Sequence, residues 1–307
     1  MAKIGNLEVA LADPFPIRPL NQFIGRKQEI DLCLAAWNLR PDGSPLLSQN
    51  VSPLHFRLEG RPGVGKNEIV YELARQLKRP LYVIQGHEEL TPEDLSLMLV
   101  PDPSGTFRDA ALMLRASPLA TAIMVGGLFF FDEINRVPDR SLSPLASVLD
   151  RRGTIYSALA GIHIGAQNPN PDVPSSFRFC CALNPALRDA GRGVLPEYIE
   201  ERTLPAINIG PLKFTELQEM IGTDLKPPAE FMQAFKQLYG DESRKEISAR
   251  QALTLMRYAM SIASSHSVPA SEAVAKAEPM IFSQKKGDTH ADGADASNTG
   301  DNDYPIN

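Results

Sequence analysis

The run Gly60–Asn67, with the sequence GRPGVGKN, has the residue types and spacing of a loop that binds phosphate groups. It matches the pattern GxxxxGK, in which glycines permit positive φ angles and let backbone N–H groups approach an anion closely. Lys66 follows the last glycine, and its ammonium group would contact the β and γ phosphates of a nucleotide. The alternative is a glycine-rich turn without a ligand. The residues that we expect to bind the nucleotide here are Gly60, Pro62, Gly63, Val64, Gly65, Lys66 and Asn67.

The residue after the lysine departs from this pattern. Ser or Thr usually occupies the position, since the hydroxyl group binds Mg²⁺, but this chain has Asn67. An amide oxygen can still coordinate Mg²⁺ or hold a metal-bound water molecule. The sequence therefore predicts that nucleotide binding is retained and leaves open that hydrolysis is slowed.

Two carboxylates follow the apolar run 128–131, which has the character of a buried strand. Asp132 would hold Mg²⁺, and Glu133 would polarise the water molecule that attacks the γ phosphate. A surface ion pair between Glu133 and Arg136 or Arg140 is the alternative. Together with Lys66, this pair of acids favours nucleotide hydrolysis.

Three further polar residues have positions that suit the same chemistry. Asn184 follows the apolar run 177–183 and could hydrogen-bond the attacking water or the γ phosphate; otherwise it is a turn residue before a proline. Arg202 and Arg250 each lie at the end or start of a helix-like segment, and guanidinium groups match phosphate oxygens well. Without such a role, both arginines would be solvated at the surface.

The elements around these residues predict an α/β fold. Residues 54–58 alternate between apolar and polar types as in a strand, and the apolar residues from Ile69 onward recur at helical spacing. Short apolar runs then alternate with helical patterns, and polar residues follow several of these runs. This order indicates a parallel sheet with a ligand across the carboxyl ends of its strands. The predicted strands after the first cover residues 80–84, 128–131, 177–183 and 206–209.

The remaining segments give weaker signals. We expect a helical segment over 92–98, a turn at 102–105, a helix over 142–149 and a hairpin over 153–165. From about residue 213 only helical patterns occur, which predicts a small helical second domain. Residues 1–20 are rich in proline and are expected to be irregular. The polar tail from 283 cannot bury enough apolar area to order itself, so it is expected to be disordered.

Composition excludes some classes of protein. The chain has 307 residues, 43% of them hydrophobic, and a net charge of −6, which is ordinary for a globular protein. This charge gives no electrostatic footprint for nucleic acid, although it leaves open a local basic patch within the acidic whole. No apolar run is long enough to span a membrane, and the start of the chain lacks a secretory pattern, so we expect a cytoplasmic protein. The three cysteines have no metal-ligand spacing; Cys180 and Cys181 should be buried thiols on opposite faces of a strand.

With these motifs in order, the chain resembles the MoxR-type AAA+ ATPases, of the helix-2-insert group. The resemblance rests on GRPGVGKN, on DEINR at 132–136, on Asn184-Pro185, on LPEYIEERT at 195–203 and on the helix opening SARQA at 248–252. It implies a parallel five-stranded sheet sandwiched by helices, with a small all-α lid domain. The implied boundaries are an arm at 1–20, an α/β domain at 21–211, the lid at 212–282 and the tail at 283–307. Residues 102–122 and 153–165 would be the insert and the hairpin of the group, and both are expected to contact substrate.

The same resemblance implies roles for particular residues. Arg202 would be the arginine finger that enters the site of a neighbouring subunit in a hexameric ring. In the family an aspartate and a phenylalanine usually flank this arginine, whereas this chain has Glu201 and Thr203 at those positions. Arg250 would be the lid residue that senses the γ phosphate. The residues implied for the adenine pocket are Phe23, Ile24 and Gly25.

The implied function is an ATPase that converts ATP and water to ADP and phosphate with Mg²⁺ as cofactor. Such a protein would act as a remodelling chaperone on a client protein or metalloenzyme complex, with a partner that carries a von Willebrand A domain. The alternative is a nucleotide-gated scaffold or switch that hydrolyses little because of Asn67. A DNA motor on the same fold is disfavoured by the acidic balance of the chain.

Overall fold

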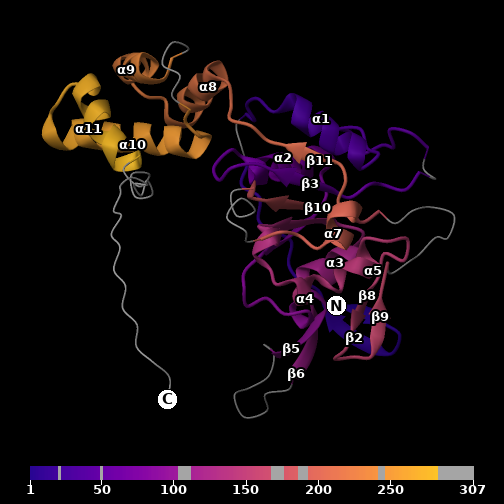
Figure 1. Ribbon diagram of the computed structural model, residues 1–307. Helices are drawn as coiled ribbons and strands as arrows, with labels where there is room; N and C mark the ends of the chain where they lie inside the picture. Colours follow the sequence, from indigo (N-terminus) through magenta and orange to yellow (C-terminus); the bar gives the residue numbers. More distant parts are fainter. Residues whose placement is uncertain are drawn as a thin grey trace, which may run out of the picture.

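A computed structural model of the protein describes residues 1–19, 22–48, 51–102, 112–166, 176–185, 193–240 and 246–282 (Figure 1). Its main feature is a five-stranded sheet in the order β11-β3-β10-β7-β4, with every neighbouring pair parallel. Each predicted strand is present within about two residues of its expected ends, so the α/β fold class is confirmed. The strands are β3 (Phe56–Glu59), β4 (Leu81–Gln85), β7 (Leu128–Asp132), β10 (Arg178–Leu183) and β11 (Ala206–Asn208).

Helices cover both faces of this sheet, and each face has its own apolar cluster. Phe130 and Cys180 belong to the cluster that also contains Trp37, while Phe129 and Cys181 belong to the other one. The prediction that adjacent cysteines point to opposite faces is therefore confirmed, and both thiols are free and buried. The helices in this part of the chain include α1 (Lys27–Ala36), α2 (Lys66–Leu77), α3 (Pro118–Val125) and α7 (Glu197–Arg202).

The segment 92–98 is not the helix that its sequence predicts. It forms one 3₁₀ turn, η1 (Glu93–Leu95), and then enters strand β5 (Leu97–Pro101). This strand pairs antiparallel with β6 (Leu112–Ala116), so cross-strand pairing overrides the weak local helical pattern. Most of the turn expected at 102–105 lies outside the described residues.

The first ten residues also differ from the irregular arm predicted for 1–20. Strands β1 (Ala2–Ile4) and β2 (Leu7–Ala10) form a hairpin, and β2 pairs in parallel with β6. The result is a second sheet in the order β1-β2-β6-β5. Strands this short carry little periodic signal, and their partner lies about a hundred residues away, which explains why the sequence did not reveal them.

The region after β7 also corrects one prediction and confirms another. After the 3₁₀ turn η2 (Ile134–Arg136), the helix expected over 142–149 is two short helices, α4 (Asp139–Leu142) and α5 (Leu145–Val148). Pro144 separates them because a proline lacks the N–H that a continuous helix needs. The hairpin expected over 153–165 is present as β8 (Ile155–Ser157) and β9 (Ile162–Ile164).

Among the described residues, four helices follow the sheet, and Figure 1 shows them grouped beside it at one end of the molecule. A third apolar cluster, centred on residues such as Phe235 and Leu255, is built from these helices and the segments that join them. No helix of the described ranges is long and apolar enough to cross a membrane. The tail from 283 lies outside the described residues. The four helices are α8 (Phe214–Leu225), α9 (Ala229–Tyr239), α10 (Ala249–His266) and α11 (Ala270–Phe282).

Candidate functional site

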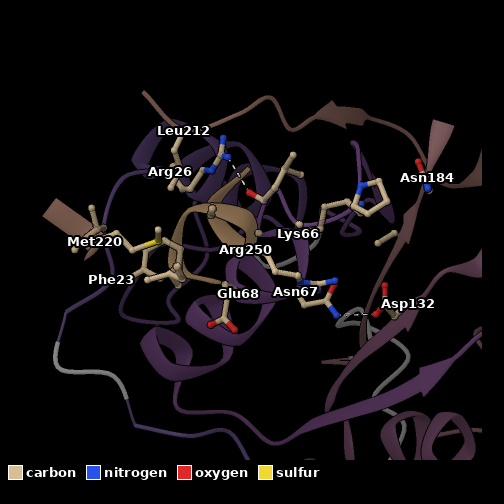
Figure 2. Close-up of a pocket in the computed structure, with 18 of the residues that line it drawn as sticks. Phe23, Arg26, Lys66, Asn67, Glu68, Asp132, Asn184, Leu212, Met220 and Arg250 are labelled. Atoms are coloured by element: carbon tan, nitrogen blue, oxygen red, sulfur yellow. Dashed lines mark hydrogen bonds between the residues drawn. The ribbon is translucent and has the colours of Figure 1, made fainter. Parts of the chain in front are cut away.

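A pocket of about 650 Å³ lies at the carboxyl edge of the five-stranded sheet, between the sheet and the C-terminal helices. Figure 2 shows side chains from both parts of the chain around it. Its volume is in the range of small-molecule sites. The predicted residues that line it are Phe23, Ile24, Pro62, Gly63, Val64, Gly65, Lys66, Asn67, Asp132, Glu133, Asn184 and Arg250.

The predicted phosphate loop joins β3 to the start of α2 on one side of this pocket. Gly63 and Gly65 have φ angles of 82° and 98°, which side chains with a Cβ rarely adopt. Lys66 opens the helix, and its Nζ donates hydrogen bonds to the carbonyl oxygens of Gly60 at 2.6 Å and Arg61 at 3.3 Å. Burial lowers the pKa of Lys66, while the carboxylates of the pocket oppose this shift. The loop thus has the backbone of a phosphate cradle, with a buried ammonium group at its end.

Asn67 contacts the first of the two predicted carboxylates directly. Its Nδ2 donates a hydrogen bond to Oδ2 of Asp132 at 2.6 Å (Figure 2). Burial raises the pKa of Asp132, and the hydrogen bond from Asn67 acts in the opposite direction. The side chains predicted to share a metal ion are therefore adjacent, and the amide group of Asn67 already satisfies one carboxylate oxygen.

Glu133 lies in the pocket in an unusual backbone conformation. Its φ angle is 51°, a left-handed value that is costly for a residue with a side chain and is often found at functional sites. Its Oε2 forms an ion pair with Nε of Arg136 at 3.0 Å and accepts a hydrogen bond from Nε2 of Gln85 at 3.4 Å. The ion pair considered as the alternative role is thus present, and Glu133 also lines the pocket.

Asn184 reaches the same pocket from the end of β10. Its backbone is held by Asn135, which donates from Nδ2 to the carbonyl oxygen of Asn184 at 3.1 Å. The Oδ1 of Asn135 also accepts a long hydrogen bond of 3.5 Å from the Asn184 backbone N–H. Asn135 belongs to the DEINR run, so this motif orients the neighbouring strand end as well as supplying the two acids.

The two predicted arginines occupy different places. Arg250 lines the pocket from the first turn of α10, and its backbone N–H lies 3.5 Å from the carbonyl oxygen of Gly63 in the phosphate loop. Arg202 is exposed at the end of α7, does not line the pocket, and donates to the carbonyl oxygen of Tyr198 at 2.9 Å. The chain brings Arg250 to its own pocket but not Arg202.

The other end of the pocket is more apolar. Phe23 and Ile24 line it as the resemblance implied, whereas Gly25 is next to it with a φ angle of 71° but is not part of the lining. Gly60 is likewise outside the lining and contributes its carbonyl oxygen to Lys66. The C-terminal helices and the segment before them add apolar side chains that the sequence analysis did not select, namely Leu212, Met220 and Leu253.

Arg26 is a pocket-lining residue that the sequence analysis missed. Its guanidinium group is buried and donates from Nη2 to the carbonyl oxygens of Val64 at 2.9 Å and Gly210 at 2.6 Å, while Nη1 pairs with Glu29 at 2.8 Å. It therefore ties the phosphate loop to the segment that leads into the C-terminal helices. Two acids, Glu68 and Asp224, also line the pocket without having been predicted. None of these residues belongs to a periodic pattern or a short motif that could have indicated its role.

Comparisons with known proteins agree with this geometry. The model of the AAA domain family, dynein-related subfamily, matches residues 55–192. The denitrification regulatory protein NirQ of Pseudomonas aeruginosa is 26% identical over 168 residues, which are 55% of each chain. NirQ of Stutzerimonas stutzeri is 23% identical over 193 residues, 63% of this chain and 60% of that one. The chain thus matches little more than half the length of these curated relatives.

One further relative and two solved structures extend the comparison. Mouse von Willebrand factor A domain-containing protein 8 is 33% identical over 84 residues, 27% of this chain and 4% of that protein. A RuvB mutant from Thermotoga maritima has a TM-score of 0.55 at 19% identity, with 84% of this chain and 71% of that chain covered. NtrX from Brucella abortus, in complex with ADP, has a TM-score of 0.50 at 14% identity, with 79% and 51% covered.

The structural similarities are at low sequence identity and establish the fold alone, which is that of AAA+ proteins. The family match and the NirQ alignments go further because both follow from the sequence itself. Residues 55–192 of this chain therefore form an AAA domain of the dynein-related, MoxR-type subfamily, and the chain is a homologue of NirQ.

Proposed function

We propose that this chain binds ATP in the pocket, hydrolyses it to ADP and phosphate, and uses the cycle to remodel a client protein or metalloenzyme complex. One observation carries the proposal. The phosphate loop with Lys66, the acids Asp132 and Glu133, and the polar residues Asn184 and Arg250 all line one pocket. Phosphoryl transfer depends mainly on positioning and on charge stabilisation, and these groups supply both.

Each residue has a role in this proposal. Lys66 binds the β and γ phosphates, Glu133 polarises the attacking water, and Asn184 orients that water or the γ phosphate. Asp132 and the amide oxygen of Asn67 would hold Mg²⁺, and the adjacent placement of these two side chains fits a cation that usually takes one or two protein oxygens. When bound, Mg²⁺ neutralises charge on the β and γ phosphate oxygens. The ion pair with Arg136 uses Oε2 of Glu133, and the other carboxylate oxygen would accept the proton of the water molecule.

The position of Arg202 supports assembly into a ring, which the resemblance implies is a hexamer. Its guanidinium group is exposed and outside the pocket of its own chain, so any contact with a γ phosphate requires another copy. An arginine supplied by a neighbour accelerates phosphoryl transfer in many nucleotide hydrolases. Arg250, by contrast, would sense the γ phosphate within its own chain.

The partners are proposed from the relatives. NirQ is named a denitrification regulatory protein, and the mouse relative is named for a von Willebrand A domain. We propose a client that is a protein or metalloenzyme complex, reached through a partner with such a domain, in the cytoplasm and without nucleic acid or membrane insertion. The helix-2 insert and the β8–β9 hairpin are the proposed contact sites for this client.

Two substitutions test the hydrolytic function. We expect Lys66→Ala to abolish binding of ATP measured by calorimetry, since it removes the phosphate ligand. Glu133→Gln should keep binding and lower phosphate release by on the order of 10²-fold or more, because it removes only the general base. Glu88→Gln, at an exposed position outside the pocket, is the matched control for the loss of a carboxylate. Normal hydrolysis by Glu133→Gln would contradict the assigned mechanism, and unchanged binding by Lys66→Ala would contradict the site.

A nucleotide-gated scaffold is the second candidate, and the contact of Asn67 with Asp132 favours it. The amide group donates to the carboxylate at 2.6 Å, so it competes with a metal ion for that oxygen. If the contact limits turnover, Asn67→Thr should raise phosphate release by roughly tenfold, on the scale of a single charge-assisted hydrogen bond, without changing nucleotide affinity. Asn67→Ala is the control because it removes the amide and adds no hydroxyl group. Equal and measurable turnover of Asn67→Thr and the original protein would contradict the scaffold, because Asn67 would then not limit hydrolysis.

A further inference from the structure

A buried arginine lies in the strand that leads into the phosphate loop. Arg57 is in the middle of β3, at a position where alternation of polar and apolar residues suggests a solvent-facing side chain. The structure instead covers this side of the strand, and Arg57 is only 8% exposed. Burial of a guanidinium group is costly unless its donors are satisfied, so its contacts show what it holds in place.

The donors of Arg57 join two parts of the molecule. Its Nε pairs with Oε1 of Glu59 at 2.6 Å, and Nη1 donates to the carbonyl oxygen of Glu200 at 2.8 Å. The same Nη1 lies 3.4 Å from the carbonyl oxygen of Thr203 and 3.5 Å from its hydroxyl group. The side chains of the ion pair are 10% and 14% exposed. One rigid guanidinium fork therefore spans from β3 to the last turn of α7.

Both ends of this bridge adjoin residues of the proposed mechanism. Glu59 directly precedes Gly60, whose carbonyl oxygen accepts the hydrogen bond from Lys66. At the other end, Glu200 and Thr203 bracket Arg202 in the sequence, and Arg57 holds backbone carbonyl groups on both sides of it. The carbonyl groups at the end of a helix otherwise lack partners, so this contact fixes the turn that carries Arg202.

We propose that Arg57 is a positioning residue that sets the direction of Arg202 toward the pocket of a neighbouring copy. The inference rests on the proposed ATP hydrolysis and on the finger role of Arg202. A displacement of about 1 Å in a catalytic group can cost on the order of 10²-fold in rate, so a loose turn at the end of α7 would impair the neighbour's reaction. Its own pocket would keep its nucleotide ligands, because Arg57 does not line it.

This role predicts a defect that acts between copies, and mixed assemblies can reveal it. A subunit with Arg57→Met would have an intact pocket and a misplaced finger, whereas Glu133→Gln has an intact finger and an inactive pocket. In a ring, the pocket of the first variant can receive the finger of the second. Random mixing of equal amounts should therefore restore hydrolysis at roughly a quarter of the interfaces of a closed ring.

The experiment compares each variant alone with equal mixtures of the full chain. We expect Arg57→Met to bind ATP within about twofold of the original protein, to assemble normally by light scattering, and to lose on the order of 10²-fold in hydrolysis. Mixing it with Glu133→Gln should restore activity, and mixing it with Arg202→Ala should not, because neither then supplies a finger. Lys276→Met removes another ion pair, with Glu272 on α11 and outside the pocket, and should leave hydrolysis unchanged.

Several outcomes would overturn the proposal. It is wrong if Arg57→Met loses nucleotide binding, if it keeps full hydrolysis, or if the mixture with Glu133→Gln stays inactive. If Arg57→Met does not fold, Arg57→Lys serves in its place, because it keeps the charge and loses the fork; failure of both to fold would show that Arg57 serves stability alone. Absence of hydrolysis in the original protein would instead contradict the proposed function, and full activity of Arg202→Ala would contradict the finger and with it this inference.

Discussion

The two sides of the pocket differ in what they contribute. The sheet side supplies the phosphate loop, Asp132, Glu133 and Asn184, all at the ends of neighbouring parallel strands. The helical side supplies apolar side chains, Arg250 and the acid Asp224. Each side also packs around its own apolar clusters. The difference indicates that one unit holds most of the groups proposed for phosphoryl transfer, while a second unit that packs separately adds Arg250 and the apolar wall of the pocket.

The polar contacts between the two sides, exemplified by an exposed ion pair and a long backbone hydrogen bond, are weak, as expected for two units that pack separately. Arg61 and Glu246 lie 3.4 Å apart with side chains 77% and 73% exposed, and an exposed pair of this kind contributes little stability. The backbone contact between Arg250 and Gly63 is 3.5 Å long. The proposed boundary at residue 211 therefore predicts that substitutions on the two sides have separable effects.

The largest expected effect is on stability of the helical side. Phe235 is fully buried and stacks on Phe214 and Tyr239 with ring centroids 5.8 Å and 5.2 Å apart. Phe235→Ala should lower the free energy of unfolding of this unit by about 3 to 5 kcal/mol because it leaves a large cavity. Hydrogen exchange should increase in α8 to α11 and stay unchanged in the five-stranded sheet. Tyr258→Ala, at an exposed position of α10, is the control; equal loss of protection in both units would mean that they unfold together.

The next effect concerns catalysis from the helical side. Arg250→Ala should lower the rate of phosphate release by on the order of 10²-fold, because a guanidinium group near the γ phosphate stabilises the transition state. ATP affinity should change much less, since the phosphate loop belongs to the sheet side. Arg257→Ala removes an exposed arginine of the same helix outside this pocket and serves as the control. Steady-state kinetics combined with calorimetry would separate the two quantities, and a loss confined to affinity would contradict the division.

A third effect should be confined to the sheet side and depends on pH. Burial, helped by the charge of Arg178, lowers the pKa of His55 from 6.5 to about 4. The unfolded chain therefore takes up a proton below pH 6.5 while the folded chain does not, so this contribution to stability is complete above pH 6.5 and is lost as the pH falls toward 4. The expected loss, reduced for partial exposure of the residue, is roughly 2 to 3 kcal/mol.

Denaturant unfolding between pH 7 and pH 4 would measure this loss. His55→Phe removes the titrating group and should flatten the dependence, and His163→Gln, at an exposed position on β9, should not. Hydrogen exchange should show the acid effect in β3 and its neighbours before the C-terminal helices. An equal acid slope for His55→Phe and the original protein would contradict the assignment.

The smallest expected effect lies where the two sides face each other. Glu68 on α2 and Asp224 on α8 both line the pocket. Burial raises the pKa of Glu68, and the negative charge of Asp224 raises it further, while the positive charge of Arg75 lowers it. At neutral pH, Glu68→Gln should raise ATP affinity by on the order of threefold, since one negative charge beside a triphosphate is removed. The gain should shrink at high salt. Glu72→Gln on the same helix is the control, and an affinity that falls would show that Glu68 binds the nucleotide instead.

The parts of the fold that the sequence analysis predicted share one property. In β7 and β10 a continuous apolar run ends in polar residues, and in α2 the glycine-rich loop is followed by apolar residues at helical spacing. These signals are local and strong. The sequence analysis missed the N-terminal hairpin because its partner β6 is about a hundred residues away, and it missed strand β5 because pairing with β6 overrides a weak local helical pattern. The site followed the same rule, since Lys66 and the two acids lie in motifs, whereas Arg26 and Arg57 do not.

The sequence by itself therefore determined the α/β order, the phosphate loop and the identity of the acids, because short motifs and periodicity act within a few residues of the chain. Only the tertiary structure decided that Arg250 reaches the pocket and Arg202 does not, and that Arg57 is buried between β3 and α7. The physical reason is that these placements depend on contacts between segments far apart in the sequence, such as β3 with the end of α7, and those segments meet only in the folded chain.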